Sequence, residues 1–420
     1  ESRDGHCGAL CSRPGARMTS AHAPSVRIVV TALGIAQIFA FGTTYYLPAV
    51  LAAPIAAETG WPLAWVIGGL SLGMLVAGAA SPWVGRRIHA QGGRTVLAAG
   101  AGLLGLGLGI LAAAPVLPVY LAGWAVIGLG MASGLYSAAF STLGQLYGDR
   151  ARQPISAVTL FGGFASTICW PLSAFLVAQF GWRGACAGYA LIQLVVVMPL
   201  YLVSLRGEQR PPAGPAVSSS AAGNIRVATL PFLLLAAIIT FGSTISTIMS
   251  VHLLAILEAR DIALGAAVAL GALVGPSQVG ARFIEMMIAR HHHPIWTMLA
   301  SALFMTVGIG TLWAGLPILS VALVFYGAGL GIESIARATP PLALFDPRNY
   351  APIMGKLALP SLIAQAAAPT IGTFLMLHLG AGRTLATLTI LGALKLALVG
   401  ALYACVRRDR TRSTSASAKP

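Results

Sequence analysis

Two residues of opposite charge stand four positions apart inside one long apolar stretch of the sequence, at 316–344. Glu333 and Arg337 would share one face of a helix at that spacing. Charges at membrane depth are costly, so both side chains should face the interior of a helix bundle or water. The carboxylate could then carry a proton, and the guanidinium could anchor a ligand or alter the carboxylate's affinity for that proton. A structural ion pair explains the spacing equally well.

Uncharged polar side chains interrupt several other apolar stretches. A tyrosine joins an apolar ring to a hydroxyl donor, which suits a cavity that receives an organic molecule. Trp170 stands beside Pro171 and could form a wall of such a cavity or simply pack. The remaining candidates for this site are three tyrosines and two glutamines: Tyr45, Tyr46, Tyr136, Gln278 and Gln365.

The sequence contains no cluster of metal ligands or catalytic acids. His291, His292 and His293 follow Arg290 in a short basic gap without a cysteine or carboxylate cluster, so a solvated turn is expected there. Gly128, Gly130 and Gly134 lie inside an apolar run, where small residues let helices approach closely, rather than in a phosphate-binding loop. We therefore expect no metal and no cofactor.

The composition places most of the chain in lipid. The 420 residues are 57% hydrophobic and 9% charged, whereas about a quarter of the residues in a soluble protein are charged. The net charge of +15 comes from basic residues in short gaps between apolar runs and in the tails. Such spacing fits membrane orientation and anionic headgroups, and it excludes nucleic acid as a partner.

Twelve apolar runs are each long enough to cross a bilayer, which takes about 20 residues. We predict an all-α integral membrane protein with six-helix bundles at 26–204 and 227–406, joined by a Pro-, Gly- and Ser-rich linker at 205–226. Tails at 1–25 and 407–420 flank the bundles, and 1–17 are set apart because Met18 could begin the native chain. The expected helices are 28–57, 63–84, 95–114, 117–146, 154–180, 184–204, 228–257, 262–288, 294–314, 316–344, 352–378 and 384–406.

The arginines alternate with these spans. If the N-terminus lies inside, the inner loops and the C-terminal tail hold most of them, and the outer loops hold only Arg183, Arg260 and Arg383. Short cytoplasmic loops carry an excess of Lys and Arg. We therefore expect both termini in the cytoplasm, in a multi-pass protein of the cytoplasmic (inner) membrane.

The two halves of the sequence repeat one another. Residues 41–44, Phe-Gly-Thr-Thr, return at 241–244 as Phe-Gly-Ser-Thr, and Pro171 returns 198 positions later as Pro369. Duplicated six-helix halves with a binding site at their interface are a feature of transporters.

Between the second and third runs, 81–94 reads S-P-W-V-G-R-R-I-H-A-Q-G-G-R and predicts a tight turn at a membrane face. Together with the repeat, it resembles the loop between helices 2 and 3 of the major facilitator superfamily of transporters, and the resemblance covers about 26–406. Histidine stands at 89, where the family usually has Asp, and could make the gate sensitive to pH because histidine changes its charge near neutral pH. The resemblance implies a gating loop formed by Pro82, Gly85, Arg86, His89, Gly92 and Arg94.

The resemblance also implies positions for other charged residues of the sequence. In this family helices 1, 4, 7 and 10 line a central cavity. Glu333 and Arg337 lie on the tenth predicted helix, which agrees with their expected place inside the bundle. Arg282 and Glu285 lie in a segment similar to the second-half counterpart of 81–94, so a role in the gate is expected for them. Helix 12 is peripheral in the family, so Lys395 should be a packed or snorkelling residue.

These observations predict a monomeric secondary transporter that moves a small organic solute by alternating access. No ATP-binding motif occurs in the sequence, so an ion gradient, most simply of protons, would drive it. An efflux exporter of drugs or toxic compounds in the same superfamily is the main alternative. A membrane-embedded enzyme is a remote alternative, because no HExxH helix or Asp-rich pair occurs.

Overall fold

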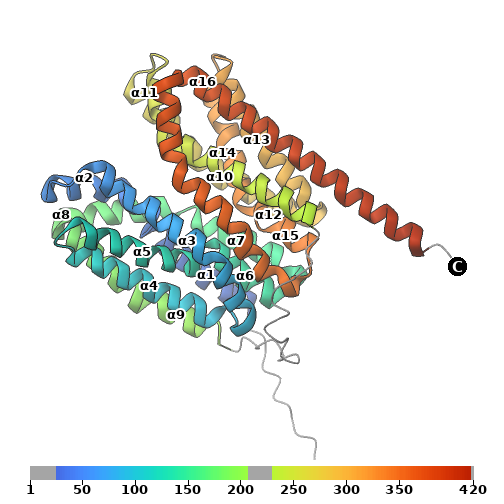
Figure 1. Ribbon diagram of the computed structural model, residues 1–420, viewed down its shortest axis with the longest axis horizontal. Helices are drawn as coiled ribbons and strands as arrows, with labels where there is room; N and C mark the ends of the chain where they lie inside the picture. Colours follow the sequence, from blue (N-terminus) through green and yellow to red (C-terminus); the bar gives the residue numbers. More distant parts are fainter. Residues whose placement is uncertain (1–24, 207–228, 418–420) are drawn as a thin grey trace, which may run out of the picture.

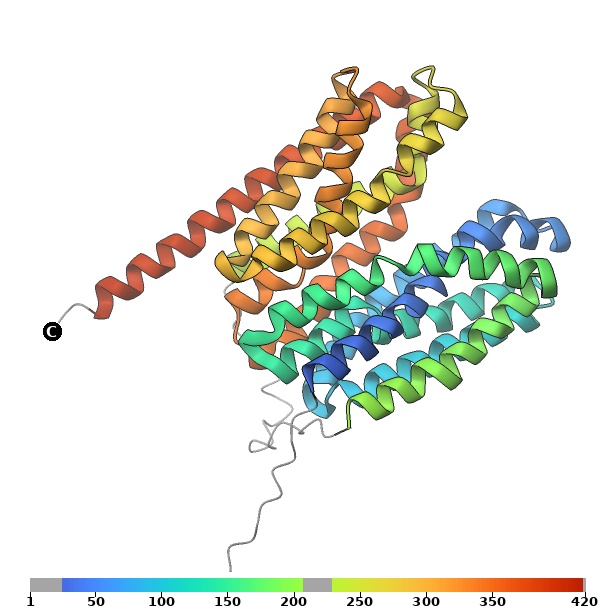
Figure 2. The same cartoon turned by 180° about the vertical axis from the view of Figure 1, so that it is seen from behind.

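The computed structural model describes residues 25–206 and 229–417, and Figures 1 and 2 show it from opposite sides. Most of the predicted tail at 1–25 and of the predicted linker at 205–226 lies outside the described residues. All regular structure within the described residues is helical, which confirms the predicted all-α class.

The first half of the chain contains several crossings that are broken into two helices. The clearest break separates α1 from α2, where the hydroxyls of Thr43 and Thr44 donate to the carbonyls of Phe39 and Ala40 (2.8 and 2.6 Å). Pro48 then stands in the first turn of α2, where its missing N–H is not needed. The helices are α1 (Val26–Gly42), α2 (Leu47–Thr59), α3 (Leu63–Gln91), α4 (Gly93–Ala113), α5 (Leu117–Gly134), α6 (Tyr136–Tyr147), α7 (Arg152–Gly162), α8 (Ala165–Ile192) and α9 (Met198–Ser204).

The second half follows the same plan. Prolines 340 and 341 begin the short helix that completes the crossing of α14. The helices are α10 (Thr229–Glu258), α11 (Leu264–Gly271), α12 (Val274–Ile288), α13 (Pro294–Trp313), α14 (Leu319–Ala336), α15 (Thr339–Leu344) and α16 (Tyr350–Ser417).

Within the described residues, nine helical stretches are long and apolar enough to cross a membrane. Two of them hold two crossings each, separated at Gly181 and Gly380, which have φ of 67° and 74° and lie 199 positions apart. The stretch of α11 and α12, broken after Gly271, supplies a further crossing. The protein is thus an all-helical membrane protein with twelve transmembrane helices in two pseudo-symmetric six-helix bundles.

The two bundles touch at one end and diverge toward the other. Figures 1 and 2 both show contact near α6, α7 and α15, whereas α2 and α11 lie far apart. We call the end where α1 begins and α9 finishes the linker end, and the opposite end, with the turns at Gly60 and Gly315, the far end. The structure is therefore closed between the bundles at the linker end.

Glycines allow the helices within each bundle to approach closely. A Cβ on Gly128 would lie 2.5 Å from the carbonyl oxygen of Gly73, and a Cβ on Gly107 would lie 2.6 Å from the side chain of Ile127. In a bilayer such close packing, rather than exclusion of water, drives helix association. The prediction that the glycines around 128 serve helix packing is confirmed.

One predicted loop is helical instead. The sequence predicts a turn over 81–94, but α3 continues through Pro82 to Gln91, and only Gly92, with φ of 83°, leaves the helix. Arg86 and Arg87, two of the three arginines that suggested a loop, are exposed on this last part of α3, so they do not oppose a helix there. The predicted gating loop is therefore a helix end followed by a one-residue turn.

Candidate functional site

A hydrogen bond between two predicted site residues joins the bundles. The hydroxyl of Tyr45, in the break between α1 and α2, donates to Oε1 of Gln365 on α16 at 3.3 Å. The amide nitrogen of Gln365 is held by the carbonyl of Ser361 at 3.1 Å, which fixes the orientation of its oxygen toward Tyr45. The two residues are 320 positions apart in the sequence, so only the tertiary structure brings them together.

Aromatic rings surround Tyr45 on the side of the first bundle. The ring of Phe41 lies 5.6 Å from that of Tyr45 and 4.6 Å from that of Tyr136, and Tyr136 stacks on Phe140 at 4.9 Å. The Tyr136 hydroxyl lies so close to Gly162 that a Cβ there would be 2.0 Å from it. Tyr136 therefore depends on a glycine for its position.

Arg282 spans the interface between the bundles. From α12 its Nη1 donates to the carbonyl of Thr159 on α7 (3.0 Å), and its Nε donates to that of Gly331 on α14 (3.2 Å). Its Nη2 donates to Oε1 of Gln278 (3.4 Å), another predicted site residue. All three acceptors are uncharged, and the side chain is buried. Arg282 thus fastens α12 to both bundles.

Arg337 has far fewer partners. It follows the last residue of α14, and its Nη2 donates to the Ser243 hydroxyl on α10 at 3.2 Å. Its Nε is buried and has no hydrogen-bond partner among the described residues. The guanidinium lies within electrostatic range of the hydroxyls of Tyr45 and Tyr136. Arg337 therefore brings a half-buried positive charge close to the Tyr45–Gln365 contact.

Glu333 pairs with a residue that the sequence did not assign to it. Its Oε2 accepts from Nζ of Lys395 at 2.6 Å and from the hydroxyl of Ser301 at 2.7 Å. Arg337 is linked to Glu333 only through the helical bond from its backbone nitrogen (3.0 Å). The expected ion pair between Glu333 and Arg337 is thus replaced by one between α14 and the last crossing of α16.

Lys395 is packed rather than snorkelling. Its side chain is 0% exposed, and that of Glu333 is 3% exposed. A Cβ on Gly242 of α10 would lie 2.3 Å from Oε1 of Glu333 and 2.8 Å from Nζ of Lys395, so a glycine makes room for the pair. The sequence signal for this pair was a lysine within an apolar run. The identity of its partner could not be predicted, because it depends on how α14 and the last crossing of α16 are rotated.

A second ionic cluster ties the bundles together nearer the linker end. Glu285 on α12 accepts from the hydroxyl of Thr297 (2.7 Å) and from Arg152 of α7 (3.4 Å), and its other oxygen lies 3.5 Å from Nε2 of His292. Nη2 of Arg152 also donates to the Thr297 hydroxyl (3.0 Å). Arg152 thus links the first bundle to the second through the Glu285 carboxylate, the Thr297 hydroxyl and the carbonyl of His292.

Paired glycines close the interface between α3 and α16. A Cβ on Gly85 would lie 2.4 Å from the carbonyl oxygen of Ala351, and a Cβ on Gly355 would lie 2.4 Å from that of Ser81. Pro82 is the neighbour of Ser81 and approaches Gly355 as well. Four of the predicted gating residues therefore contact the opposite bundle: Pro82, Gly85, Arg282 and Glu285.

The other predicted gating residues lie elsewhere. Arg86 is exposed, and Nε of Arg94 donates to the carbonyl of Leu202 (3.0 Å) inside the first bundle. The carbonyl of His89 accepts from the side-chain amide of Gln145 at 3.1 Å. The structure therefore divides the predicted gating set between the interface and the first bundle.

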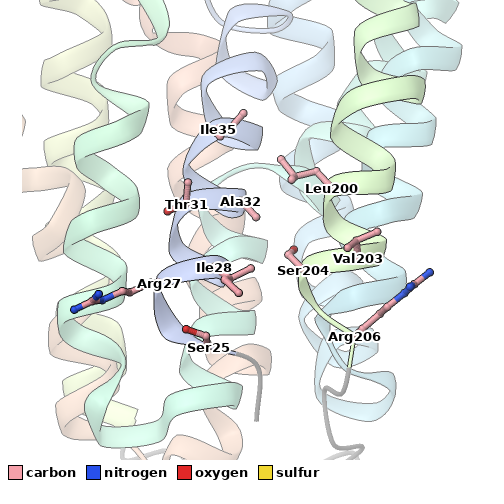
Figure 3. Close-up of a pocket in the computed structure, with 10 residues that line it drawn as sticks. All are labelled: Ser25, Arg27, Ile28, Thr31, Ala32, Ile35, Leu200, Val203, Ser204 and Arg206. Carbon is pink, nitrogen blue, oxygen red and sulfur yellow. The ribbon is translucent and has the colours of Figure 1, made fainter. Parts of the chain in front are cut away.

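Two cavities lie beside α1 and α2. One, of about 510 Å³, runs between α2 and α8 and is lined by Trp170, whose ring packs edge-on against Tyr46 at 5.9 Å. The other, of about 620 Å³, lies between α1 and α9, where Arg27 and Arg206 point away from each other (Figure 3). Since its arginines diverge and its walls are otherwise mainly apolar, this second cavity offers no converging polar groups.

Comparisons with known proteins agree with this architecture. The sequence profile of the family described as Major Facilitator Superfamily matches residues 33–291. No curated protein sequence is detectably similar to the chain.

Solved structures share the fold at low sequence identity. The human organic anion transporter MFSD10 (TETRAN) superposes with a TM-score of 0.70 at 16% identity, over 90% of this chain and 100% of its own. The proton:xylose symporter XylE gives a TM-score of 0.67 at 14% identity, over 89% and 94%. The E. coli fucose:proton symporter FucP gives 0.66 at 14% identity, over 90% and 98%.

Proposed function

The chain belongs to the Major Facilitator Superfamily and is a multi-pass membrane transporter, not an enzyme; from this premise we propose that it moves a small organic solute by alternating access, coupled to protons. The observation that carries the proposal is the asymmetry of the interface. The bundles are fastened at the linker end by Arg152–Glu285, by Arg282 and by the glycines of α3 and α16, and they diverge at the far end. Bundles fastened at one end only are what we would expect of one of the two states that alternating access requires.

The site we propose lies where the bundles meet around Tyr45 and Gln365. Tyr136 and Phe41 supply aromatic surface beside it, and Arg337 supplies charge. Because the Tyr45–Gln365 bond joins the two bundles, it lies where rocking of the bundles would change access to the site. A solute bound there would thus be released to opposite sides in the two states.

Glu333 is the residue we propose as the proton carrier. It is one of two carboxylates buried within the described crossings, and the other, Glu285, serves the cluster at the linker end. Two of the solved neighbours are named as proton symporters, which supports testing this role. Charged residues inside a membrane bundle commonly mark such pathways.

The alternating-access proposal can be tested without knowing the solute. Spin labels at Arg87 and Lys356 would report the linker end, and labels at Ala57 and Ala259 the far end; all four are exposed. We expect Glu285→Gln to lengthen the first distance and shorten the second in a fraction of molecules, because it weakens the link between the bundles. Glu58→Gln is the matched control, since the pair of Glu58 with Arg183 lies within the first bundle. Distances that stay the same in both variants would contradict rocking of the bundles.

The membrane orientation is a separate proposal. We propose cytoplasmic termini, in a cytoplasmic membrane, from the placement of the arginines. A cysteine introduced at Gly315, in a far-end turn, should react with an impermeant reagent added outside cells, whereas one at Gly92 should not. Labelling of Gly92→Cys from outside would reverse the orientation.

A further inference from the structure

The two buried acidic side chains of the described crossings already have partners. Glu333 is neutralised by Lys395, and Glu285 lies against Arg152 and His292. No carboxylate among the described residues lies within ion-pair distance of Arg282 or Arg337. Arg282 and Arg337 therefore give the region between the bundles an excess positive charge. The Glu333–Lys395 pair adds no net charge to it.

The two arginines differ in how their donors are used. A guanidinium carries five N–H donors. Arg282 directs three of its nitrogens to acceptors of the protein, from both bundles, which identifies it as a structural link. Arg337 has one acceptor, the Ser243 hydroxyl, and its buried Nε has none among the described residues. Burial of a charged donor without an acceptor is costly, so Arg337 is poised for an acceptor that the protein does not supply.

The surroundings of Arg337 limit what that acceptor can be. A neutral ligand would leave the charge uncompensated, and a cation would be repelled. An oxyanion can accept two parallel N–H bonds from one guanidinium and neutralise it at the same time. The rings of Phe41 and Tyr136, which lie beside Tyr45, offer apolar surface to the remainder of the ligand.

From this geometry we propose that the transported solute is an organic anion, a carboxylate or similar oxyanion with an apolar or aromatic body. Arg337 binds the anionic group, and the tyrosine and phenylalanine rings bind the body. The proposal rests on the proposed transport function and assigns the substrate class of the same site.

The test uses matched probes on the purified full-length protein. The panel consists of aryl and alkyl carboxylates, such as 3-phenylpropionate, each with its own primary amide and its own amine of equal length. Binding is measured as the shift in melting temperature and by calorimetry. We expect only carboxylates to bind, and we expect Arg337→Gln to weaken the tightest of them by about tenfold or more, the loss expected for charge-assisted hydrogen bonds.

Two further variants separate charge from folding. Arg337→Lys keeps the charge and should retain the preference for carboxylates with reduced affinity, because a lysine lacks the planar fork of donors. Arg183→Gln, in the exposed pair with Glu58, should change nothing. Three results would each overturn the proposal. They are amides or amines that bind as tightly as the carboxylates, a preference for carboxylates that is unchanged in Arg337→Gln, and a panel in which no carboxylate binds.

The outcome is independent of the test of alternating access. The spin-label distances use no ligand, so rocking bundles with no preference for carboxylates would refute the substrate class alone. Conversely, a carboxylate that binds through Arg337 to bundles that do not rock would refute transport and leave an anion-binding protein.

Discussion

Replacement of Glu333 by glutamine should expose how strongly the second bundle depends on its buried ion pair. Glu333 and Lys395 lie 2.6 Å apart and are almost completely buried, and Ser301 donates a further bond to the same oxygen. Removal of one partner leaves the other charge buried without compensation, which costs about 3–5 kcal/mol. We therefore expect Glu333→Gln to lower the free energy of unfolding by about that amount.

A double variant separates the pair from its surroundings. Glu333→Gln combined with Lys395→Met removes both charges at nearly constant volume, and apolar replacement of a buried pair is often neutral or stabilising. Unfolding in detergent with increasing denaturant measures both variants. Glu58→Gln is the control, because its pair with Arg183 is substantially exposed and such pairs contribute about 0–1 kcal/mol. If Glu333→Gln were no less stable than this control, or the double variant as unstable as the single one, the ion pair would not stabilise the bundle.

The same two variants test the proposed proton role. A proton carrier cannot be replaced, so both variants should lose accumulation driven by a proton gradient in proteoliposomes while they retain exchange of solute. A purely structural pair predicts the opposite for the double variant, which would fold and couple normally. Normal coupling in the double variant would therefore refute the assignment of Glu333 as carrier.

Three other substitutions should have defined effects. Gly162→Ala would place a Cβ 2.0 Å from the Tyr136 hydroxyl and should slow transport, and addition of Tyr136→Phe should partly restore the initial rate because it removes the clashing atom. Gly85→Ala would place a Cβ 2.4 Å from the carbonyl of Ala351 and should lengthen the spin-label distance at the linker end; Gly102→Ala, with open space around it, should not. His89→Asp should flatten the dependence of transport on pH below neutrality if the histidine tunes the gate, and an unchanged profile would remove it from the mechanism.

The helices could be predicted because each crossing is a long apolar run bounded by charged or turn-forming residues. The expected run at 95–114 corresponds to α4 at Gly93–Ala113, and that at 294–314 to α13 at Pro294–Trp313. The error over 81–94 arose because Pro82 and two arginines resemble a loop in composition. In the structure the arginines face away from the bundle, so a helix accommodates them without a buried charge.

The partners of the site residues were harder to predict, for a physical reason. Spacing along one helix identifies residues that share a face, and it correctly suggested that Glu333 lies inside the bundle. It gives no information on which other helix presents a charge at the same depth. Lys395 lies 62 positions away on the last crossing, and only the rotation and tilt of both helices bring its ammonium to the carboxylate.

This change of partner alters how protons and an anion could be coupled. Protonation of Glu333 would leave Lys395 as an extra positive charge beside Gly242, and the next residue, Ser243, accepts the hydrogen bond from Arg337. An anion on Arg337 should therefore bind more tightly when Glu333 is protonated, and by linkage the bound anion should favour that protonation. A proton on Glu333 and an anion on Arg337 would thus favour each other, which fixes the sign of the expected pH dependence. The affinity for a carboxylate, measured by calorimetry in the wild type, should rise as the pH falls, and it should lose this dependence in Glu333→Gln. An affinity that stays constant or falls with decreasing pH in the wild type would show that the buried pair and the arginine act independently.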